Sequence, residues 1–188
     1  MIRKTSLTCS AALLLAIAAC SSSTDVSTSL SPSAAAKLAA DMDANSTLGP
    51  GDVSFNTNGT NTFSVTKQCP KGGQVALSGV IVGTGNQATH SLTVDATANR
   101  TDTGCAFDTD NGVVTLTGNL AYTGHLNIVN GALSGLQTQT HKGSFTWARG
   151  GVSGPCEVNL SSSYDPATHT ATVTGTFCGA NINVTRTR

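Results

Sequence analysis

The sequence predicts a mainly β protein: an antiparallel meander of about eight to ten strands, in a curled sheet or barrel-like form, with one short N-terminal helix. From Asp52 onward, apolar residues alternate with small polar residues, and turn residues recur at short intervals. A period of two is typical of strands that bury one face. Because the connections are short, successive strands should pair antiparallel. We favour a curled sheet or a barrel over a sandwich.

The strands expected from this alternation lie near residues 53–56, 62–67, 74–82, 91–98, 113–122, 125–129, 132–138, 143–147, 157–163 and 170–177. Asn58-Gly59, Asn130-Gly131 and Asp165-Pro166 stand between them, and such pairs favour hairpins and tight turns. Four related segments each end in glycine: VALSG (75–79), VTLTG (114–118), GALSG (131–135) and ATVTG (171–175). A glycine late in a strand marks a bend, a bulge or a close approach of backbones.

One helix is expected before the strands, over residues 33–43. Ser31 is a good N-cap, and Pro32 suits the first helical position. The segment SAAAKLAADMD that follows is rich in helix formers. A stripe at helical spacing should pack against the β domain. Its members are Ala35, Leu38, Ala39 and Met42.

The first twenty residues have the layout of an export signal. Arg3 and Lys4 precede an apolar run at 11–19. That run is too short to span a bilayer, which takes about 20 apolar residues. Cys20 ends the run, where an ordinary signal would need only small residues.

Ile17-Ala18-Ala19-Cys20 resembles the lipobox of bacterial lipoproteins, in which an aliphatic residue and two small residues precede a lipidated cysteine. The resemblance implies that diacylglycerol is attached to the Cys20 sulfur, that the chain is cleaved before Cys20, and that the new amine is acylated. Two or three acyl chains make a lasting anchor, since each buried methylene contributes about 0.8 kcal/mol. The alternative is a plain signal peptide that ends at a cysteine by chance.

The resulting layout has three parts: a lipoprotein signal peptide at 1–19, the lipidated cysteine with a flexible Ser-rich tether at 20–30, and a single β domain at 31–188. The tether is polar and of low complexity, so it should bury little surface. Ser21 resembles the outer-membrane sorting signal of Gram-negative lipoproteins. The expected location is therefore the cell envelope, most simply the outer membrane, on its periplasmic face or at the cell surface.

Two disulfides are expected, because Cys9 leaves with the signal and Cys20 takes the lipid. The remaining four cysteines form an even set in an oxidising compartment, and none stand at the C-x₂-C spacing of zinc sites. We predict the pairs Cys69–Cys105 and Cys156–Cys178, because the midpoint of each falls at or just beyond an expected turn. The second pair conflicts with strand alternation, so it requires a bulge at Gly175 or an irregular strand end at Cys178-Gly179.

The charge balance argues against a nucleic-acid partner. Without Arg3 and Lys4, eight basic residues face ten acidic ones, a net charge of −2. This field is too weak to attract nucleic acid. No cofactor or metal is expected.

Four groups of residues are candidates for chemistry or binding. The loop at 151–155 resembles the nucleophile loop of trypsin-like proteases only faintly, and a glycine-rich turn explains it better. The aspartates of a possible calcium loop do not match EF-hand spacing. An exposed aromatic pair could stack on a sugar, but Trp147 is expected to be a core residue or to cover a sheet edge. All four histidines are expected at the surface. These candidates are Asp102, Asp108 and Asp110 for calcium, Phe145 and Trp147 for sugar, and His90, His125, His141 and His169.

The leading functional hypothesis is a membrane-anchored envelope lipoprotein whose β domain binds or scaffolds and is not an enzyme. The membrane would be a partner through the lipid on Cys20, with a further protein or small apolar ligand unidentified. The alternative is a carrier that holds a lipid or other apolar ligand in a groove of the curled sheet. A hydrolase is third, and would need a serine or carboxylate within reach of a histidine. The carrier's groove would be lined by Val75, Leu77, Val80, Val82, Leu92, Val94 and Leu116.

Overall fold

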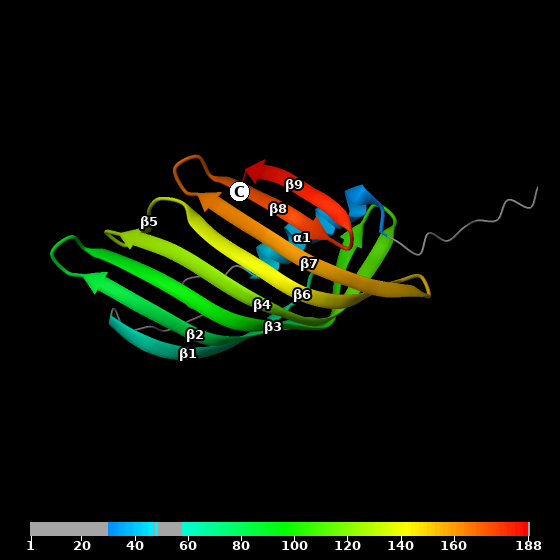
Figure 1. Cartoon of the computed structure of the whole chain (residues 1–188), viewed down its shortest axis with the longest axis horizontal. Helices are drawn as coiled ribbons and strands as arrows, with labels where there is room; N and C mark the ends of the chain where they lie inside the picture. The colour runs from blue at the N-terminus through cyan, green and yellow to red at the C-terminus, as the bar shows by residue number, and fades with distance from the viewer. Residues whose placement is uncertain (1–29, 47, 49–57, 188) are drawn as a thin grey trace, which may run out of the picture.

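The computed structural model describes residues 30–46, 48 and 58–187 (Figure 1). The signal peptide, Cys20, the tether up to Ser29 and the strand expected at 53–56 lie outside the described residues. One helix precedes nine strands in the described part. The elements are α1 (Pro32–Ser46), β1 (Asn58–Gln68), β2 (Gln74–Asn86), β3 (Ser91–Thr109), β4 (Gly112–Val129), β5 (Ala132–Leu133), β6 (Gln137–Arg149), β7 (Val152–Asp165), β8 (Thr170–Phe177) and β9 (Ala180–Thr187).

The strands form one antiparallel sheet in the order β1-β2-β3-β4-β6-β7-β8-β9, and the short β5 pairs with β4. The predicted meander is confirmed. The sheet is not a barrel, because β1 and β9 are its two edges and do not pair with each other. Nor is it strongly curled, so the expected barrel-like form is corrected to an open sheet (Figure 1).

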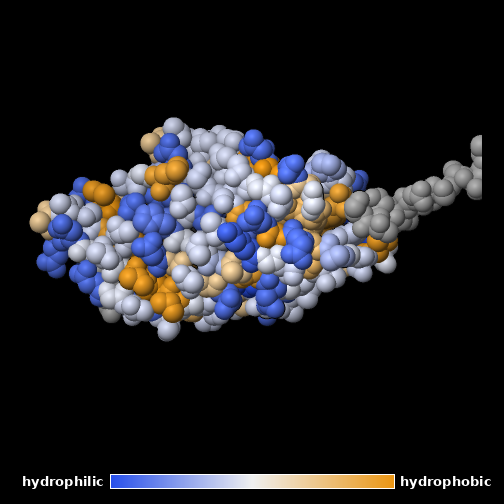
Figure 2. Space-filling view, in the orientation of Figure 1, coloured by the Kyte–Doolittle hydropathy of each residue, from blue (hydrophilic) through white to orange (hydrophobic). Residues whose placement is uncertain are grey.

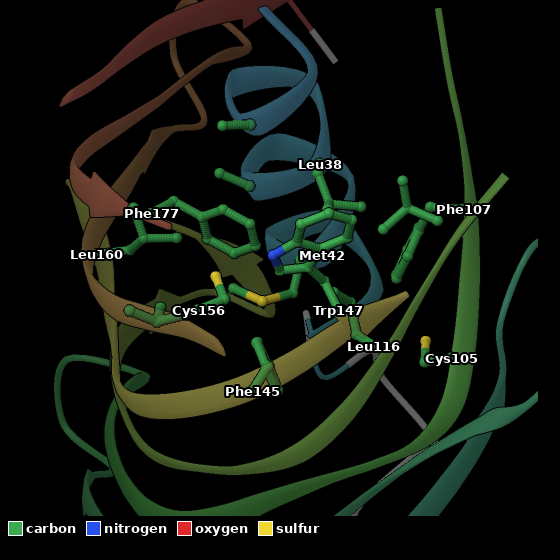
Figure 3. Close-up of a cluster of buried hydrophobic side chains, with 14 of the residues drawn as sticks. Leu38, Met42, Cys105, Phe107, Leu116, Phe145, Trp147, Cys156, Leu160 and Phe177 are labelled. Atoms are coloured by element: carbon green, nitrogen blue, oxygen red, sulfur yellow. The ribbon is translucent and has the colours of Figure 1, made fainter. Parts of the chain in front are cut away.

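Helix α1 lies across one face of the sheet, which we call the inner face (Figure 1). The predicted stripe is fully buried: Ala35, Leu38, Ala39 and Met42. The stripe forms one buried cluster with apolar side chains of β2 to β4 and β6 to β9, and Figure 3 shows Leu38 and Met42 close to Trp147. Burial contributes roughly 25 cal/mol for each Å² of apolar surface removed from water, so this interface is what holds helix and sheet together.

The core also includes Leu30, which is only 6% exposed. The composition of 20–30 suggested a tether over this whole segment, and in the structure its last residue packs with α1 and the sheet. The folded part of the chain therefore includes Leu30.

Replacing Leu30 by alanine is expected to lower the free energy of unfolding by about 2 kcal/mol, because a buried leucine side chain is lost. Deleting 21–29, which is polar, should leave the melting temperature unchanged within a few degrees. Thermal denaturation of both variants tests this. Equal losses would show that residues before Leu30 also contribute to the fold.

The glycines of the related segments have the special backbone roles expected of them. At Gly175 φ is +124°, and a Cβ atom there would lie 2.1 Å from the backbone oxygen of Asn159. At Gly79 a Cβ atom would lie 2.1 Å from the backbone oxygen of Thr97. Both distances are far below van der Waals contact, so neighbouring strands approach more closely than any side chain would permit.

Both predicted disulfides are confirmed, with Cα–Cα distances of 5.4 Å for Cys69–Cys105 and 4.1 Å for Cys156–Cys178. Cys178 and Gly179 form the two-residue connection between β8 and β9, and both have positive φ, 49° and 80°. This is the backbone of a type I′ turn. Cys178 thus lies outside the alternation of β8, which resolves the conflict through an irregular strand end.

None of the described helices has the length and apolar character that a transmembrane helix requires.

Candidate functional site

A cluster of polar side chains lies buried between α1 and the inner face. Its centre is Asp43 on α1, which is 1% exposed. The Ser162 hydroxyl on β7 donates a hydrogen bond to Asp43 Oδ1 at 2.5 Å, and the Gln139 amide on β6 donates to the same oxygen. His141 Nε2, also from β6, lies 3.8 Å from Asp43 Oδ1. We call these four residues the Asp43 cluster.

The Asp43 cluster is built by strand register. His141 is paired with Tyr122 on β4 and with Leu160 on β7, while Gln139 is paired with Ser162. Side chains two residues apart on a strand share a face, so β6 and β7 present these groups together beneath the helix. The ring centroids of Tyr122 and His141 are 5.3 Å apart.

Of the two titratable groups of the Asp43 cluster, one is charged at neutral pH and the other is neutral. Burial raises the pKa of Asp43, but the contacts with His141, Ser162 and Gln139 outweigh burial and leave this pKa below its ordinary value. Burial lowers the pKa of His141, and the attraction of Asp43 only partly offsets that effect. Burial, together with the charge of Asp43, raises the pKa of Tyr122 to about 12. At neutral pH the Asp43 cluster therefore holds a carboxylate beside a neutral imidazole, and the neighbouring Tyr122 phenol is neutral.

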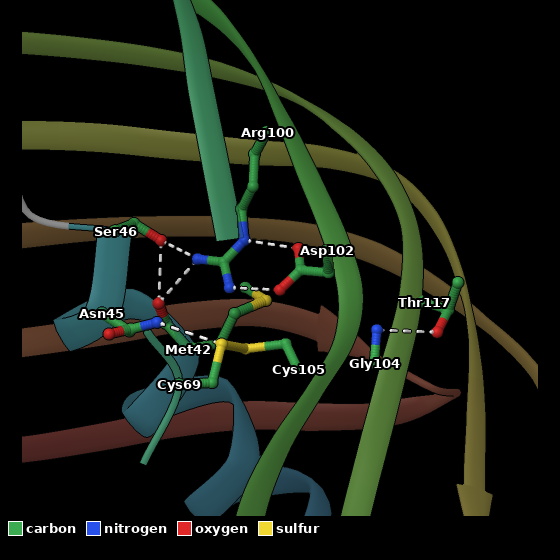
Figure 4. Close-up of a disulfide and its surroundings, with 9 residues drawn as sticks. All are labelled: Met42, Asn45, Ser46, Cys69, Arg100, Asp102, Gly104, Cys105 and Thr117. Carbon is green, nitrogen blue, oxygen red and sulfur yellow. Dashed lines mark hydrogen bonds and ion pairs between the residues drawn. A yellow bond between two sulfur atoms is a disulfide. The ribbon is translucent and has the colours of Figure 1, made fainter. Parts of the chain in front are cut away.

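A second buried group joins the end of α1 to β3 (Figure 4). Arg100 and Asp102 are both buried, and the guanidinium donates two hydrogen bonds of 2.7 Å to the carboxylate. Arg100 also donates to the backbone oxygen of Met42 at 2.9 Å and to the Ser46 hydroxyl. This bidentate geometry is the strong form of a charged pair. Asp102, one of the three aspartates of the possible calcium set, is therefore paired with Arg100.

The arrangement around Asp43 is not that of a hydrolytic triad. In a triad the histidine accepts the proton of the serine while the carboxylate orients the histidine. Here Ser162 donates to the carboxylate instead, and neither nitrogen of His141 has a hydrogen-bond partner among the described residues. His141 is fully buried, so the expectation that all four histidines lie at the surface is wrong for this one.

The opposite face of the sheet, which we call the outer face, is rich in hydroxyl and amide side chains. Figure 2 shows mainly the pale colour of weakly polar residues, with scattered hydrophilic and apolar patches. Neighbouring strands join these groups by hydrogen bonds, such as Thr123 to Thr140 at 2.7 Å and Thr101 to Asn119 at 2.7 Å. One row crosses eight strands: Thr62, Val80, Thr97, Thr123, Thr140, Ser161, Thr174 and Asn183.

The outer face also carries a histidine–carboxylate pair. His125 Nδ1 lies 2.7 Å from Asp95 Oδ1, and His125 Nε2 lies 3.3 Å from the Asn127 amide nitrogen. The two side chains of the pair are 41% and 63% exposed. A hydrolase would need such a contact between a histidine and a carboxylate. Both ring nitrogens of His125 are already in contact, one with Asp95 and one with Asn127, and neither contact involves a hydroxyl group that could act as the nucleophile.

The other sequence candidates are not brought together as sites. Asp102 pairs with Arg100, whereas Asp108 pairs with Lys71 at 2.7 Å. Among the described residues, no group of three or more His, Cys, Asp or Glu is placed to hold a metal ion. Trp147 is 1% exposed, so its predicted core position is confirmed, and Phe145, at 3%, belongs to the same buried cluster.

The residues named for a carrier groove do not line one surface. Val80 and Val82 lie on the outer face and are 37% and 43% exposed. The remaining members lie on the inner face and pack within its two apolar clusters: Val75, Leu77, Leu92, Val94 and Leu116.

Comparison with known proteins found no matching family model, no similar curated sequence and no similar solved structure.

Proposed function

We propose that this chain is a lipid-anchored lipoprotein of the bacterial cell envelope whose β domain serves as a non-enzymatic binding or scaffolding module. The lipobox at 17–20 supports the anchor, and the two disulfides fit an oxidising compartment, although only weakly. The outer membrane is the proposed location, on the strength of Ser21.

The observation that carries the binding role is the difference between the two sheet faces. The inner face is packed against α1, while the outer face presents hydroxyl and amide groups over eight paired strands. Hydrogen bonds across the strands fix these side chains, so less rotamer entropy is lost when a ligand binds. The outer face is therefore the proposed contact surface.

The anchor also fits the shape of the domain. Helix α1 begins at the end of the sheet where the β3–β4 and β8–β9 turns lie (Figure 1). Lys37, in the first turns of α1, donates a hydrogen bond to the backbone oxygen of Asp108 at that end. A tether joined to Leu30 would hold this end toward the membrane and leave the outer face accessible from the side.

Replacing Cys20 by alanine is expected to move the protein from the membrane fraction to the soluble fraction, because the site of lipid attachment is lost. Fractionation followed by immunoblotting measures this, and Cys9→Ala is the matched control that should leave the distribution unchanged. Membrane association that survives Cys20→Ala would rule out the proposed anchor.

The contact surface can be tested by photo-crosslinking in intact cells. A photoreactive residue at Thr97 or Thr123, in the middle of the outer face, should give a discrete crosslinked product. The same residue at Asn111, in the β3–β4 turn, is the control. Thr140→Glu beside Thr123 should reduce the product by placing a charge within the row. Equal crosslinking from the face and the turn would contradict a role for the outer face.

A further inference from the structure

We propose that α1 is an acid-released latch: protonation at His141 undocks the helix from the inner face while the disulfide-linked sheet stays folded. The inference goes beyond the binding role proposed above. It rests on how the helix is attached, on what surrounds His141, and on the position of the two disulfides.

The most buried polar contacts of α1 come from a few side chains, and Lys37 and Arg186 add more exposed ones. Asp43 is held by Ser162 and Gln139, which lie 119 and 96 residues away in the sequence. The Met42 carbonyl and the Ser46 hydroxyl accept from Arg100. Each of these groups is buried or partly buried, so any polar partner left without a hydrogen bond is costly. Undocking of α1 must break all of them together.

The two disulfides do not include α1. Cys69–Cys105 joins the β1–β2 turn to β3, and Cys156–Cys178 joins β7 to the β8–β9 turn. Both crosslinks therefore stabilise the sheet alone. A helix attached without crosslinks to a crosslinked sheet can open as a unit at lower free energy than the whole domain unfolds.

His141 is the group through which acid would act. Its ring is buried, and neither nitrogen has a hydrogen-bond partner among the described residues. The charged and titratable groups around it come from each neighbouring element: Asp43 from α1, Arg100 and Asp102 from β3, and Tyr122 from β4. Arg100 disfavours a protonated ring and Asp102 favours it, so their opposing charges largely offset each other, and Asp43 is the nearest carboxylate that favours protonation.

The direction of the effect follows from where the proton binds. In the docked form burial holds the pKa of His141 below its ordinary value of 6.5, whereas an exposed ring in the undocked form would titrate near that value. As the pH falls below 6.5, His141 binds a proton in the undocked form but not in the docked form, so docking weakens. The lowered pKa of Asp43 preserves its contribution until much lower pH. In the window from pH 7.5 to 5, His141 is therefore the member of the cluster that responds.

Hydrogen exchange of the full chain tests the latch. Protection factors, corrected for the pH dependence of intrinsic exchange, should fall about tenfold or more for the amides of α1 between pH 7.5 and 5. Amides of β6 and β7 should change much less. His141→Gln should abolish the pH dependence at α1, and His125→Gln, the same change on the outer face, should keep it.

Several results would overturn the proposal. Protection of α1 that is constant with pH, or that falls equally in the sheet, would show that no separate latch exists. An unaltered pH response in His141→Gln would show that another group acts. If that variant does not fold, an NMR titration of the His141 imidazole resonances in the wild-type chain provides the test. A His141 ring that titrates at its ordinary pKa while α1 stays protected would contradict the latch.

Discussion

Replacing Asp102 by alanine is expected to lower the free energy of unfolding by about 3 to 5 kcal/mol. The substitution leaves the Arg100 guanidinium buried without its carboxylate, and both side chains are fully buried in the native protein. A charge left unpaired in the interior costs far more than the ion pair contributes. Urea or guanidinium denaturation at neutral pH measures the loss, with the slope of the transition compared between variants.

Two controls separate this cost from the loss of side-chain volume. Asp108→Ala breaks the exposed pair with Lys71 and should cost less than about 1 kcal/mol, because solvent screens that pair. The double variant Arg100→Met with Asp102→Leu removes both charges and should be more stable than Asp102→Ala alone. If the double variant were the less stable of the two, the contacts of Arg100 with α1 would outweigh the cost of its buried charge.

Removing either disulfide by a pair of Cys→Ala substitutions is expected to lower the free energy of unfolding by about 3 to 4 kcal/mol. The loops that the bridges close span 36 and 22 residues, and the longer loop should give the slightly larger loss. Denaturant melts of the two double variants against the oxidised wild type provide the measurement.

The same experiment checks the connectivity. Peptide mapping without reduction should find Cys69 joined to Cys105 and Cys156 joined to Cys178 in the wild type. A double variant that retains the stability of the oxidised protein would show that its bridge constrains the unfolded chain little. Detection of a Cys69–Cys156 peptide would contradict the observed sheet order.

The elements that the sequence predicted well are those with local signals. Helix α1 begins at Pro32 as expected from Ser31 and Pro32. It continues to Ser46, three residues past the expected end, where Ser46 contacts Arg100 on β3. Tertiary contacts of this kind leave no local pattern. Strand β8 has the expected bounds, since turn residues precede it and Cys178-Gly179 follows it.

Strand β4 shows where local signals misled. The sequence predicts two strands here, at 113–122 and 125–129, with a break at Thr123-Gly124. In the structure Gly124 continues the strand, and a Cβ atom there would lie 2.7 Å from the Tyr122 hydroxyl oxygen. Gly124 therefore leaves space for the Tyr122 ring and does not form a turn. Strand β9 was missed altogether, although Ile182 and Val184 alternate within it.

The buried polar groups were also missed, and a usable signal existed. Arg100 and Asp102 continue the alternation of Val94, Ala96 and Ala98 along β3. A charged residue at the apolar positions of a strand faces the core, so it must find a partner there. Arg100 and Asp102 are each other's partner on the same strand, whereas the further contacts of Arg100 with Met42 and Ser46 lie on α1 and leave no pattern in the sequence. The position of Asp43 opposite Ser162 depends on a contact across 119 residues.

The packing of α1 beside β9 also sets the order in which the domain can be completed. Arg186 on β9 donates to the Ala40 backbone oxygen, 146 residues away along the chain, and lies 3.5 Å from Asp41. The strand pairs of the meander join consecutive strands, apart from β4 with β6, which are separated only by the short β5, but helix docking joins the two ends of the domain. Contacts of such long sequence separation form late and slowly. The apolar stripe of α1 is synthesised first, but its packing beside β9 is complete only after the last strand is made. The stripe of a nascent chain would therefore stay exposed until β9 has been synthesised.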